Sequence, residues 1–382
     1  MINIKNIAVI AHVDHGKTTL VDALLRQTGI FRENQKVIDR VLDNNDLEKE
    51  RGITILAKCT SISHNNFKLN LVDTPGHADF GGEVERILGM VEGALLLVDS
   101  SEGVMPQTKF VLDKALKLGL KIILVVNKID KKESRPDEVV NEVFDLFVSL
   151  NATEEQLDFP TIFCSGKLGW SIENISDLKE NMQPLMNCII NNISSPEKNI
   201  SDSFSMLATI IENDPFLGRV ITGRIKTGML KPNIIANVLD NNNNLIETAR
   251  LTKILSYKGI DRVQLDEAQA GDIIAIAGLQ KATVSHTICS PEVKKSIPAP
   301  SIDPPIMSIT LSVNDSPLAG KEGDKITSRH IRERLYRESE GNVAISVNET
   351  ENSDAFDVSG RGELQLSILV ETMRREGFEL SI

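Results

Sequence analysis

The sequence is poor in aromatic residues and cysteine, and it lacks long apolar runs. Aromatic residues make up 4% of the 382 residues, so we do not expect base stacking on exposed rings to be its main mode of nucleic-acid binding. No apolar run approaches the roughly 18–20 residues that a membrane helix requires. The first ten residues also lack the basic and apolar regions of a signal peptide. We therefore expect a cytoplasmic protein with no membrane contact.

The cysteines are too few and too dispersed for a disulfide framework or a zinc site. They contain no CxxC pair, so we expect reduced thiols packed in the core, at Cys59, Cys164, Cys188 and Cys289. The formal net charge of −12 argues against wrapping of nucleic acid by a basic surface, although it is compatible with a local basic patch. With 41% hydrophobic and 25% charged residues, the composition is that of a soluble globular protein. The length predicts two or three domains.

Short apolar runs and helix-length segments alternate over the first half of the sequence. This alternation predicts an α/β domain over residues 1–197, built on a mainly parallel sheet that is covered on both faces. The expected strands are Ile7–Ile10, Leu69–Val72, Ala94–Val98, Ile122–Val126 and Thr161–Cys164. The expected helices are Lys17–Thr28, Gly81–Glu92, Gln107–Leu118 and Asp137–Leu150.

Two proline-containing joints, residues 194–202 and 297–305, divide the rest of the sequence. Between them, short strands and turn signals such as Asn241–Asn244 predict an antiparallel β-barrel over residues 203–292. Residues 303–382 have the strand and helix order of a ferredoxin-like α+β domain. A final strand is expected to begin at Gly377. Because the sequence stops at Ile382, we expect this strand to be cut short and the natural protein to continue.

The loop after the first expected strand matches a phosphate-binding loop, G-x-x-x-x-G-K-[ST], with Ala11 in place of the first glycine. Backbone N–H groups at a helix start can hold phosphate oxygens, and Gly16 lets the backbone approach them. Lys17 is expected to bind the β- and γ-phosphates, and the Thr18 hydroxyl is expected to ligate Mg²⁺. Ala11 is acceptable if its φ is negative. The alternative is an ordinary turn with a lone lysine.

The residues that follow Ile122–Val126 predict specificity for guanine. The Asp130 carboxylate can accept hydrogen bonds from two N–H groups of guanine, whereas adenine would leave this charge unpaired. Asn127 and Lys128 are expected to hold the purine ring and brace the phosphate loop. The loop after the next strand, residues Ser165, Gly166 and Lys167, is expected to close over the edge of the base. A polar loop without a ligand is the alternative interpretation.

Two further segments are candidates for the Mg²⁺ and the γ-phosphate. Asp73 ends an expected strand, where α/β sheets bind ligands, and suits a Mg²⁺ ligand that acts through water, while the Gly76 N–H could hold the γ-phosphate. Thr54 follows the charged stretch 39–51, which we expect to be mobile. Thr54 could then reach Mg²⁺ when a γ-phosphate orders the loop.

His77 is the candidate catalytic residue. It comes directly after the expected γ-phosphate contact, where a side chain could orient the attacking water. Positioning matters more than proton abstraction in this reaction, so weak intrinsic activity would follow if a partner must reorient His77. The alternative is a histidine that caps the helix starting near Gly81.

In this order, the segments His12–Thr18 (HVDHGKT) and Asp73–His77 (DTPGH) resemble the translational GTPases. Within that group the sequence resembles the BipA/TypA family over essentially its whole length. The resemblance is to the first three domains of the family members. The segments that carry this resemblance are residues 43–57, 77–86, 143–160, 320–329 and 358–380. Members resemble elongation factor G in this part and carry two further C-terminal domains.

The resemblance implies a monomeric, ribosome-associated GTPase that converts GTP to GDP with Mg²⁺. It also implies a role in large-subunit assembly and in stress or low-temperature growth, and a response to guanosine tetraphosphate. The site residues carried over are Asp14, His15, Gly16, Lys17, Thr18, Thr19, Thr54, Asp73, Gly76, His77, Asn127, Lys128 and Asp130. Val13 and Ile53 resemble an apolar pair proposed to flank the catalytic histidine, and ordinary packing is an equal alternative.

Two other functions stay open. One is a nucleotide-gated assembly factor in which hydrolysis merely resets the cycle. The other is an elongation-type translocase, which residues 143–160 and 320–329 disfavour. Lys325, Arg329 and Arg332, spaced i, i+4, i+7 on an expected helix over 325–340, could contact ribosomal RNA phosphates together with Arg337. A solvated helix face would show the same pattern.

Overall fold

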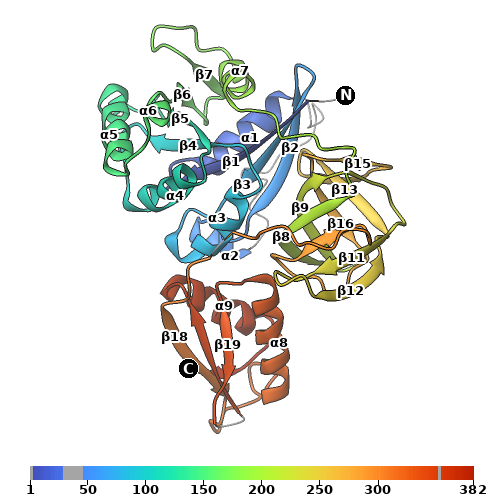
Figure 1. The fold of residues 1–382 in the computed structure, drawn as a ribbon. Coiled ribbons are helices and arrows are strands. Elements are labelled where there is room, and N and C mark those ends of the chain that lie inside the picture. The colour runs from blue at the N-terminus through green and yellow to red at the C-terminus, as the bar shows by residue number, and fades with distance from the viewer. Residues whose placement is uncertain (1–2, 29–45, 301, 352–353) are drawn as a thin grey trace. The chain divides into compact units, whose positions relative to one another are not determined.

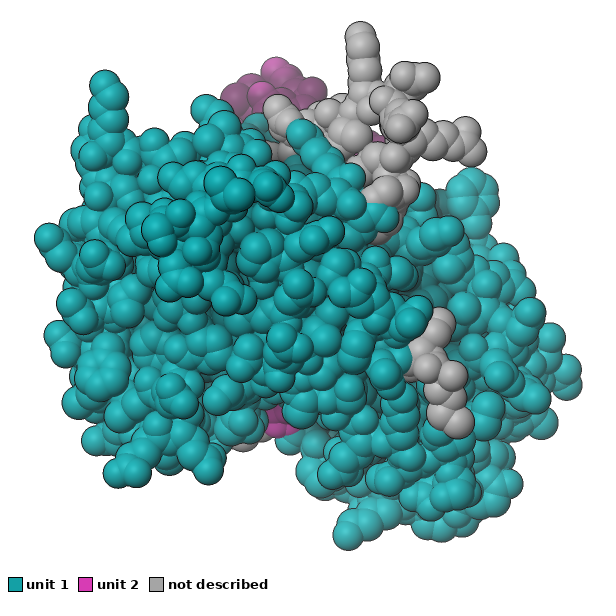
Figure 2. All heavy atoms as spheres, turned by 90° about the horizontal axis from the view of Figure 1, so that it is seen from above, with its two compact units in different colours: residues 1–77, 86–299 teal, residues 78–85, 300–382 magenta. Residues whose placement is uncertain are grey.

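The computed structural model describes residues 3–28, 46–300, 302–351 and 354–382 (Figure 1). The chain divides into two compact units, coloured separately in Figure 2. The first unit comprises residues 1–77 and 86–299, and the second comprises residues 78–85 and 300–382.

The first unit begins with a seven-stranded mixed sheet in the order β2-β3-β1-β4-β5-β6-β7. Five adjacent strands, from β3 to β6 in that order, are parallel, and the two outer pairs are antiparallel. The parallel arrangement agrees with the near-continuous apolar runs, because such strands are buried on both faces. The strands are β1 (Asn3–Ala11), β2 (Lys58–His64), β3 (Phe67–Asp73), β4 (Gly93–Asp99), β5 (Lys121–Asn127), β6 (Thr161–Ser165) and β7 (Trp170–Ile172).

Helices α1 and α7 pack on this sheet through buried leucine, isoleucine and methionine side chains. The expected strands and helices of this domain are present, with ends shifted by a few residues. The helices are α1 (Lys17–Gln27), α2 (Asp46–Arg51), α3 (Gly81–Leu88), α4 (Pro106–Lys117), α5 (Pro136–Ser149), α6 (Glu154–Leu157) and α7 (Gln183–Asn192). A short 3₁₀ helix η1 (Ala78–Phe80) precedes α3, and residues 78–85 group with the second unit. In the stretch expected to be mobile, residues 46–51 form α2, and residues 39–45 lie outside the described residues.

The first unit continues with an antiparallel β domain, as the turn signals predicted. Its eight-stranded sheet has the order β12-β11-β17-β8-β9-β16-β13-β14, and β10 pairs with β15. Asn241–Asn244 form the turn between β11 and β12, where the Asp240 carboxylate accepts backbone hydrogen bonds. The strands are β8 (Ser205–Asp214), β9 (Gly218–Thr227), β10 (Met229–Leu230), β11 (Ile235–Leu239), β12 (Leu245–Arg250), β13 (Lys253–Lys258), β14 (Asp261–Gln264), β15 (Ala268–Gln269), β16 (Ile273–Ala277) and β17 (Thr287–Cys289).

Polar contacts join the α/β sheet to the β domain within the first unit. The Lys68 ammonium lies 2.7 and 2.8 Å from the two carboxylate oxygens of Asp272. Asn70 donates to the same carboxylate at 3.1 Å. Ser61 and Gly259 form an isolated antiparallel bridge. These two parts of the chain are therefore held together by ionic and backbone contacts.

The second unit contains a four-stranded antiparallel sheet in the order β19-β20-β18-β21, with two helices. This is the ferredoxin-like arrangement expected from the sequence. The α8 helix begins at Ser328 instead of the expected Lys325, because the Thr327 hydroxyl accepts a hydrogen bond from the His330 N–H and caps the helix there. The elements are β18 (Met307–Val313), α8 (Ser328–Gly341), β19 (Ser346–Glu349), β20 (Ala355–Gly360), α9 (Glu363–Arg375) and β21 (Leu380–Ser381).

All four cysteines are free and buried, as expected. Burial raises the pKa of the Cys188 thiol to about 11, so these thiols are protonated at neutral pH. Among the described residues, none of the helices combines the length and the apolarity needed to cross a membrane.

Candidate nucleotide-binding site

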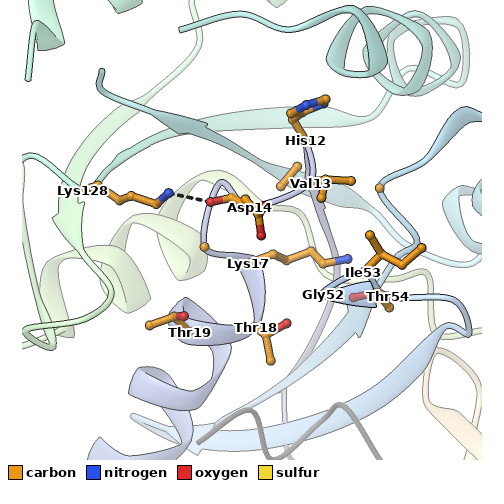
Figure 3. Close-up of a pocket in the computed structure, with 13 residues that line it drawn as sticks. His12, Val13, Asp14, Lys17, Thr18, Thr19, Gly52, Ile53, Thr54 and Lys128 are labelled. Atoms are coloured by element: carbon orange, nitrogen blue, oxygen red, sulfur yellow. Dashed lines mark hydrogen bonds between the residues drawn. The ribbon is translucent and has the colours of Figure 1, made fainter. Parts of the chain in front are cut away.

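A pocket of about 230 Å³ lies over the loop between β1 and α1 (Figure 3). The N-terminal residue of α1 is Lys17, and Gly16 precedes it with φ +92°. A Cβ atom at this position would lie 2.6 Å from Asn127 Nδ2, so glycine is required on both conformational and steric grounds. Ala11 is the last residue of β1, and its φ is not positive. This is the condition under which alanine can replace the first glycine of the motif. The lining residues are Ala11, His12, Val13, Asp14, Gly16, Lys17, Thr18, Thr19, Gly52, Ile53, Thr54, Gly76 and Lys128.

Lys17, which lines the pocket, forms a buried ion pair with Asp73. The Lys17 ammonium lies 3.0 Å from Asp73 Oδ1 and also donates to the Thr74 carbonyl. Burial raises the pKa of Asp73, and the nearby Lys17 charge opposes this shift. In Figure 3 the Lys17 side chain extends toward Ile53 and Thr54. The end of β3 thus places a carboxylate directly beside the phosphate-loop lysine.

Thr54 is brought to Asp73 by the segment that follows α2. Its hydroxyl donates to Asp73 Oδ2 at 3.5 Å, and its side chain is buried. The fully buried Glu48 of α2 holds the next residues, because its Oε1 accepts the backbone N–H groups of Ile55 and Leu56 at 3.0 and 3.1 Å. Glu48 was not among the predicted site residues.

Gly76 lines the pocket, and His77 does not. A Cβ at Gly76 would lie 2.8 Å from the Ala11 carbonyl oxygen, so glycine permits the close approach of this segment to the phosphate loop. His77, which follows immediately, is half-buried. The candidate catalytic histidine is therefore adjacent in the chain to the pocket wall.

Asn127 links the three loops that were expected to bind the nucleotide. Its Nδ2 donates to the His15 carbonyl and its Oδ1 accepts from the Gly166 N–H, both at 2.9 Å. Lys128 donates to the Asp14 carbonyl at 2.5 Å, the contact dashed in Figure 3. The phosphate loop, the guanine motif and the 165–167 loop are thus held in one arrangement.

The remaining predicted site residues differ in their exposure. Asp130 and Lys167 are exposed, and Ser165 is buried. The His15 imidazole is also buried and does not line the pocket, because its Nδ1 accepts the Asp99 N–H at 3.3 Å. His15 therefore faces the sheet, and its backbone carbonyl belongs to the loop.

The donor set beside the pocket is suited to Mg²⁺, which prefers oxygen ligands. Thr18 and Thr54 supply hydroxyl groups and Asp73 supplies a carboxylate. The two Asp73 oxygens lie close to both neighbours, because Oδ1 is 3.0 Å from the Lys17 ammonium and Oδ2 is 3.5 Å from the Thr54 hydroxyl. A small, hard cation therefore fits these residues.

The basic residues of the second unit do not form the expected stripe. Lys325 precedes α8 and forms a parallel bridge with Phe378, so its placement on the helix was wrong. Arg329 pairs with Glu333 at 2.9 Å. Arg332 pairs with Glu349 at 2.5 Å. These exposed charges are partly neutralised within the unit itself.

A phosphate loop at the carboxyl edge of this sheet, with a guanine motif beside it, defines a GTP-binding domain of the elongation-factor type. The family model "Elongation factor Tu GTP binding domain" matches residues 2–195. The model "Elongation factor Tu domain 2" matches residues 218–289.

The chain belongs to the BipA family of translational GTPases. It is 53% identical over 380 residues to "Large ribosomal subunit assembly factor BipA" of Buchnera aphidicola subsp. Schizaphis graminum. It is 50% identical over 380 residues to the protein of that name from Salmonella typhimurium. Both matches cover 100% of this chain and 62% of the relative, so the chain spans about 62% of the length of these relatives.

A crystal structure of a protein from Thermus thermophilus has a similar fold. The TM-score is 0.76 at 19% sequence identity, and the match covers 100% of this chain and 67% of that chain. At this identity the match shows the likeness of the fold alone.

Proposed function

We propose that this chain binds GTP and GDP together with Mg²⁺ and hydrolyses GTP, and that it acts on the large ribosomal subunit during assembly. The observation that carries the proposal is the pocket over Gly16–Thr19, whose lining residue Lys17 lies 3.0 Å from the Asp73 carboxylate. The names of the relatives support the ribosomal part. A ribosomal partner would also place the protein in the cytoplasm.

Each wall of the pocket would meet a different part of the nucleotide. The backbone of residues 14–19 would hold the phosphates, and the Lys17 ammonium would neutralise the β- and γ-oxygens. Asn127 and Lys128 would hold the purine, and Asp130 would read its two N–H groups. Thr18, Thr54 and Asp73 would hold Mg²⁺, which when bound supplies positive charge to the phosphate oxygens.

His77 would orient the attacking water. Because it does not line the pocket, we propose that the ribosome brings it into place and so stimulates hydrolysis. The expected result is slow multiple-turnover hydrolysis by the chain alone and faster hydrolysis with ribosomes. His77→Ala should lose this stimulation and keep its affinity for GTP. An unchanged rate in His77→Ala would remove the catalytic role.

Calorimetry with GDP and a non-cleavable GTP analogue tests the binding site. Lys17→Ala should lose tight binding of the triphosphate, whereas Lys117→Ala should not. Lys117 is a suitable control because it is exposed and pairs with Asp113 on α4, away from the pocket. Equal affinities for both variants would show that the phosphate site has been assigned wrongly.

Asp130→Asn tests the guanine assignment. The substitution replaces a pair of acceptors with an amide, so preference should shift from guanine to xanthine nucleotides. Unchanged GTP affinity would remove Asp130 from the site. The same pocket would also accept guanosine tetraphosphate through its guanine and 5′-diphosphate, which displacement of labelled GDP would measure.

The nucleotide-gated alternative keeps its own test. If binding alone matters for subunit assembly, His77→Ala should retain GTP-dependent association with ribosomes and support growth in a strain that lacks the wild-type gene. If turnover matters, the variant should fail to support growth.

A further inference from the structure

Asp99 ends β4 at the edge of the sheet where the nucleotide pocket lies. Its Cα is in register with Asn127 of β5, and the Ser100 N–H donates to the Asn127 carbonyl at 2.9 Å. The Asp99 side chain is fully buried. A buried carboxylate thus lies beside the guanine motif, although none of the roles above uses it.

Two lysines of the loop after β5 converge on this carboxylate. Asp99 Oδ2 lies 2.8 Å from the Lys128 ammonium and 3.0 Å from the Lys131 ammonium. Oδ1 accepts from the Ser101 N–H at 2.8 Å and from its hydroxyl at 2.6 Å. Burial by itself would raise the pKa of Asp99, but hydrogen bonds from Lys128, Ser101 and Lys131 outweigh it and hold that pKa well below its usual range. The carboxylate is therefore charged at neutral pH.

Lys128 is held between Asp99 and the phosphate loop. Its ammonium donates to the Asp14 carbonyl at 2.5 Å as well as pairing with Asp99. Both Lys128 and Asp14 have positive φ, +61° and +63°. A residue other than glycine stays in this conformation when its surroundings fix it. The Asp99 N–H adds a second link to the loop through His15 Nδ1 at 3.3 Å.

Stability alone is a poor reason for this arrangement. Burying a carboxylate with two ammonium groups carries a desolvation cost that offsets much of the attraction. The contacts instead fix a position. Asp99 Oδ2 holds the Lys128 ammonium, and Lys128 joins the guanine motif to the phosphate loop. Lys131 shares that oxygen and also contacts Ser101, at 3.2 Å, outside the pocket lining.

We propose that Asp99 is a positioning residue for guanine nucleotide binding, which acts by holding Lys128 against the phosphate loop. The inference rests on the proposed function, because it concerns the same nucleotide site. Asp99 does not line the pocket and would act on the nucleotide only through Lys128, so its removal should loosen the purine and the phosphates together. Removal of Asp99 should lower the affinity for all purine nucleotides by the same factor. A change at Asp130 should instead alter the preference among bases.

The test measures the Kd for GDP and for inosine diphosphate in the full 382-residue chain. Asp99→Asn should raise both values by about 10- to 100-fold, the loss expected for one charge-assisted hydrogen bond. Lys131→Met is the matched control, because it removes the other lysine from the same oxygen. It should change either Kd by less than about 3-fold.

A double-mutant cycle separates positioning from a general structural effect. In a Lys128→Met background, Asp99→Asn should add less than about 3-fold, because the side chain through which it acts is already gone. A purely structural role would add the same factor in both backgrounds and would overturn the proposal. So would a wild-type Kd in the Asp99→Asn variant.

If circular dichroism shows that Asp99→Asn does not fold, the single lysine variants decide. Lys128→Met should weaken GDP binding and Lys131→Met should not; equal effects would refute the proposal. Absence of GDP binding by the wild-type chain would instead refute the proposed function. The two failures are therefore distinct.

Discussion

Replacing Gly16 with alanine should damage the site in a way that the structure allows to be calculated. Gly16 precedes α1 with φ +92°, a conformation that side chains other than hydrogen rarely adopt. The added Cβ would lie 2.6 Å from Asn127 Nδ2. That nitrogen donates to the His15 carbonyl, and Oδ1 of the same amide accepts from the Gly166 N–H. One methyl group therefore strains the turn and displaces the amide that joins three loops.

The expected cost has two parts. The left-handed backbone costs an alanine about 1–2 kcal/mol. Displacement of Asn127 leaves buried partners unsatisfied, at about 1–3 kcal/mol. Gly119 is a matched control, because its φ is +69° and a Cβ there would meet no atom within 4 Å. Gly119→Ala should carry the first cost alone, so the free energies of unfolding of the two variants should differ by about 1–3 kcal/mol.

Urea unfolding without nucleotide measures this difference, and calorimetry with GDP measures its effect on binding. Gly16→Ala should bind GDP at least about 10-fold more weakly than Gly119→Ala, because Asn127 can no longer hold the loops. The reasoning is refuted if the two variants unfold at the same urea concentration, or if Gly16→Ala binds GDP like the wild type.

Two other predictions concern buried polar groups of the first unit. Burial lowers the pKa of His15 in the folded chain. As the pH falls from 6.5 to that lower pKa, the unfolded chain binds the proton and the folded chain does not. The free energy of unfolding should therefore fall by up to about 1.4 kcal/mol for each unit by which the pH is lowered. A protonated Nδ1 could no longer accept the Asp99 N–H. Between pH 7.5 and 5.5, urea unfolding should show a smaller loss of stability in His15→Gln than in the wild type. Equal losses would contradict the assignment of this pH dependence to His15. Asp272→Ala should cost about 3–5 kcal/mol in urea unfolding because it removes the carboxylate that pairs with the mostly buried Lys68 and leaves its charge with the Ser256 hydroxyl. The exposed Glu267→Ala should cost less than about 1 kcal/mol, and similar costs would show that the Asp272 contact is weak.

Local motifs explain how much of the site the sequence could predict. In three short segments, neighbouring residues are expected to bind the same ligand, so the motif can be recognised from the sequence alone. These segments are residues 11–19, 73–77 and 127–130. The rule that ligands bind at the carboxyl ends of parallel strands correctly predicted that these segments would meet. The roles of the predicted site residues in binding and hydrolysis, from Lys17 and Thr18 to Asp130, Lys167 and His77, all stay predictions.

Boundaries set by side-chain caps were harder to predict. The α8 helix was expected from Lys325, but Thr327 caps it two residues later. Similarly, the helix expected over 81–92 ends at Leu88, and residues 78–85 group with the second unit. Asp79 explains part of that grouping, because its Oδ2 accepts the Leu364 N–H at 2.9 Å, at the start of α9. A carboxylate that caps a helix 285 residues away leaves no local pattern in the sequence.

Asp99 and Glu48 show why the supports of the site escape a reading by motifs. Each is an acidic residue that is fully buried and that holds other protein groups. Its partners are fixed by sheet register or by a helix and the loop after it, which no spacing rule encodes. One signal was nevertheless available: Asp99 follows an apolar strand directly, as Asp73 does, and the argument that selected Asp73 applies equally to it. Every carboxylate at the binding edge of a parallel sheet should therefore be examined, whether or not a named motif contains it.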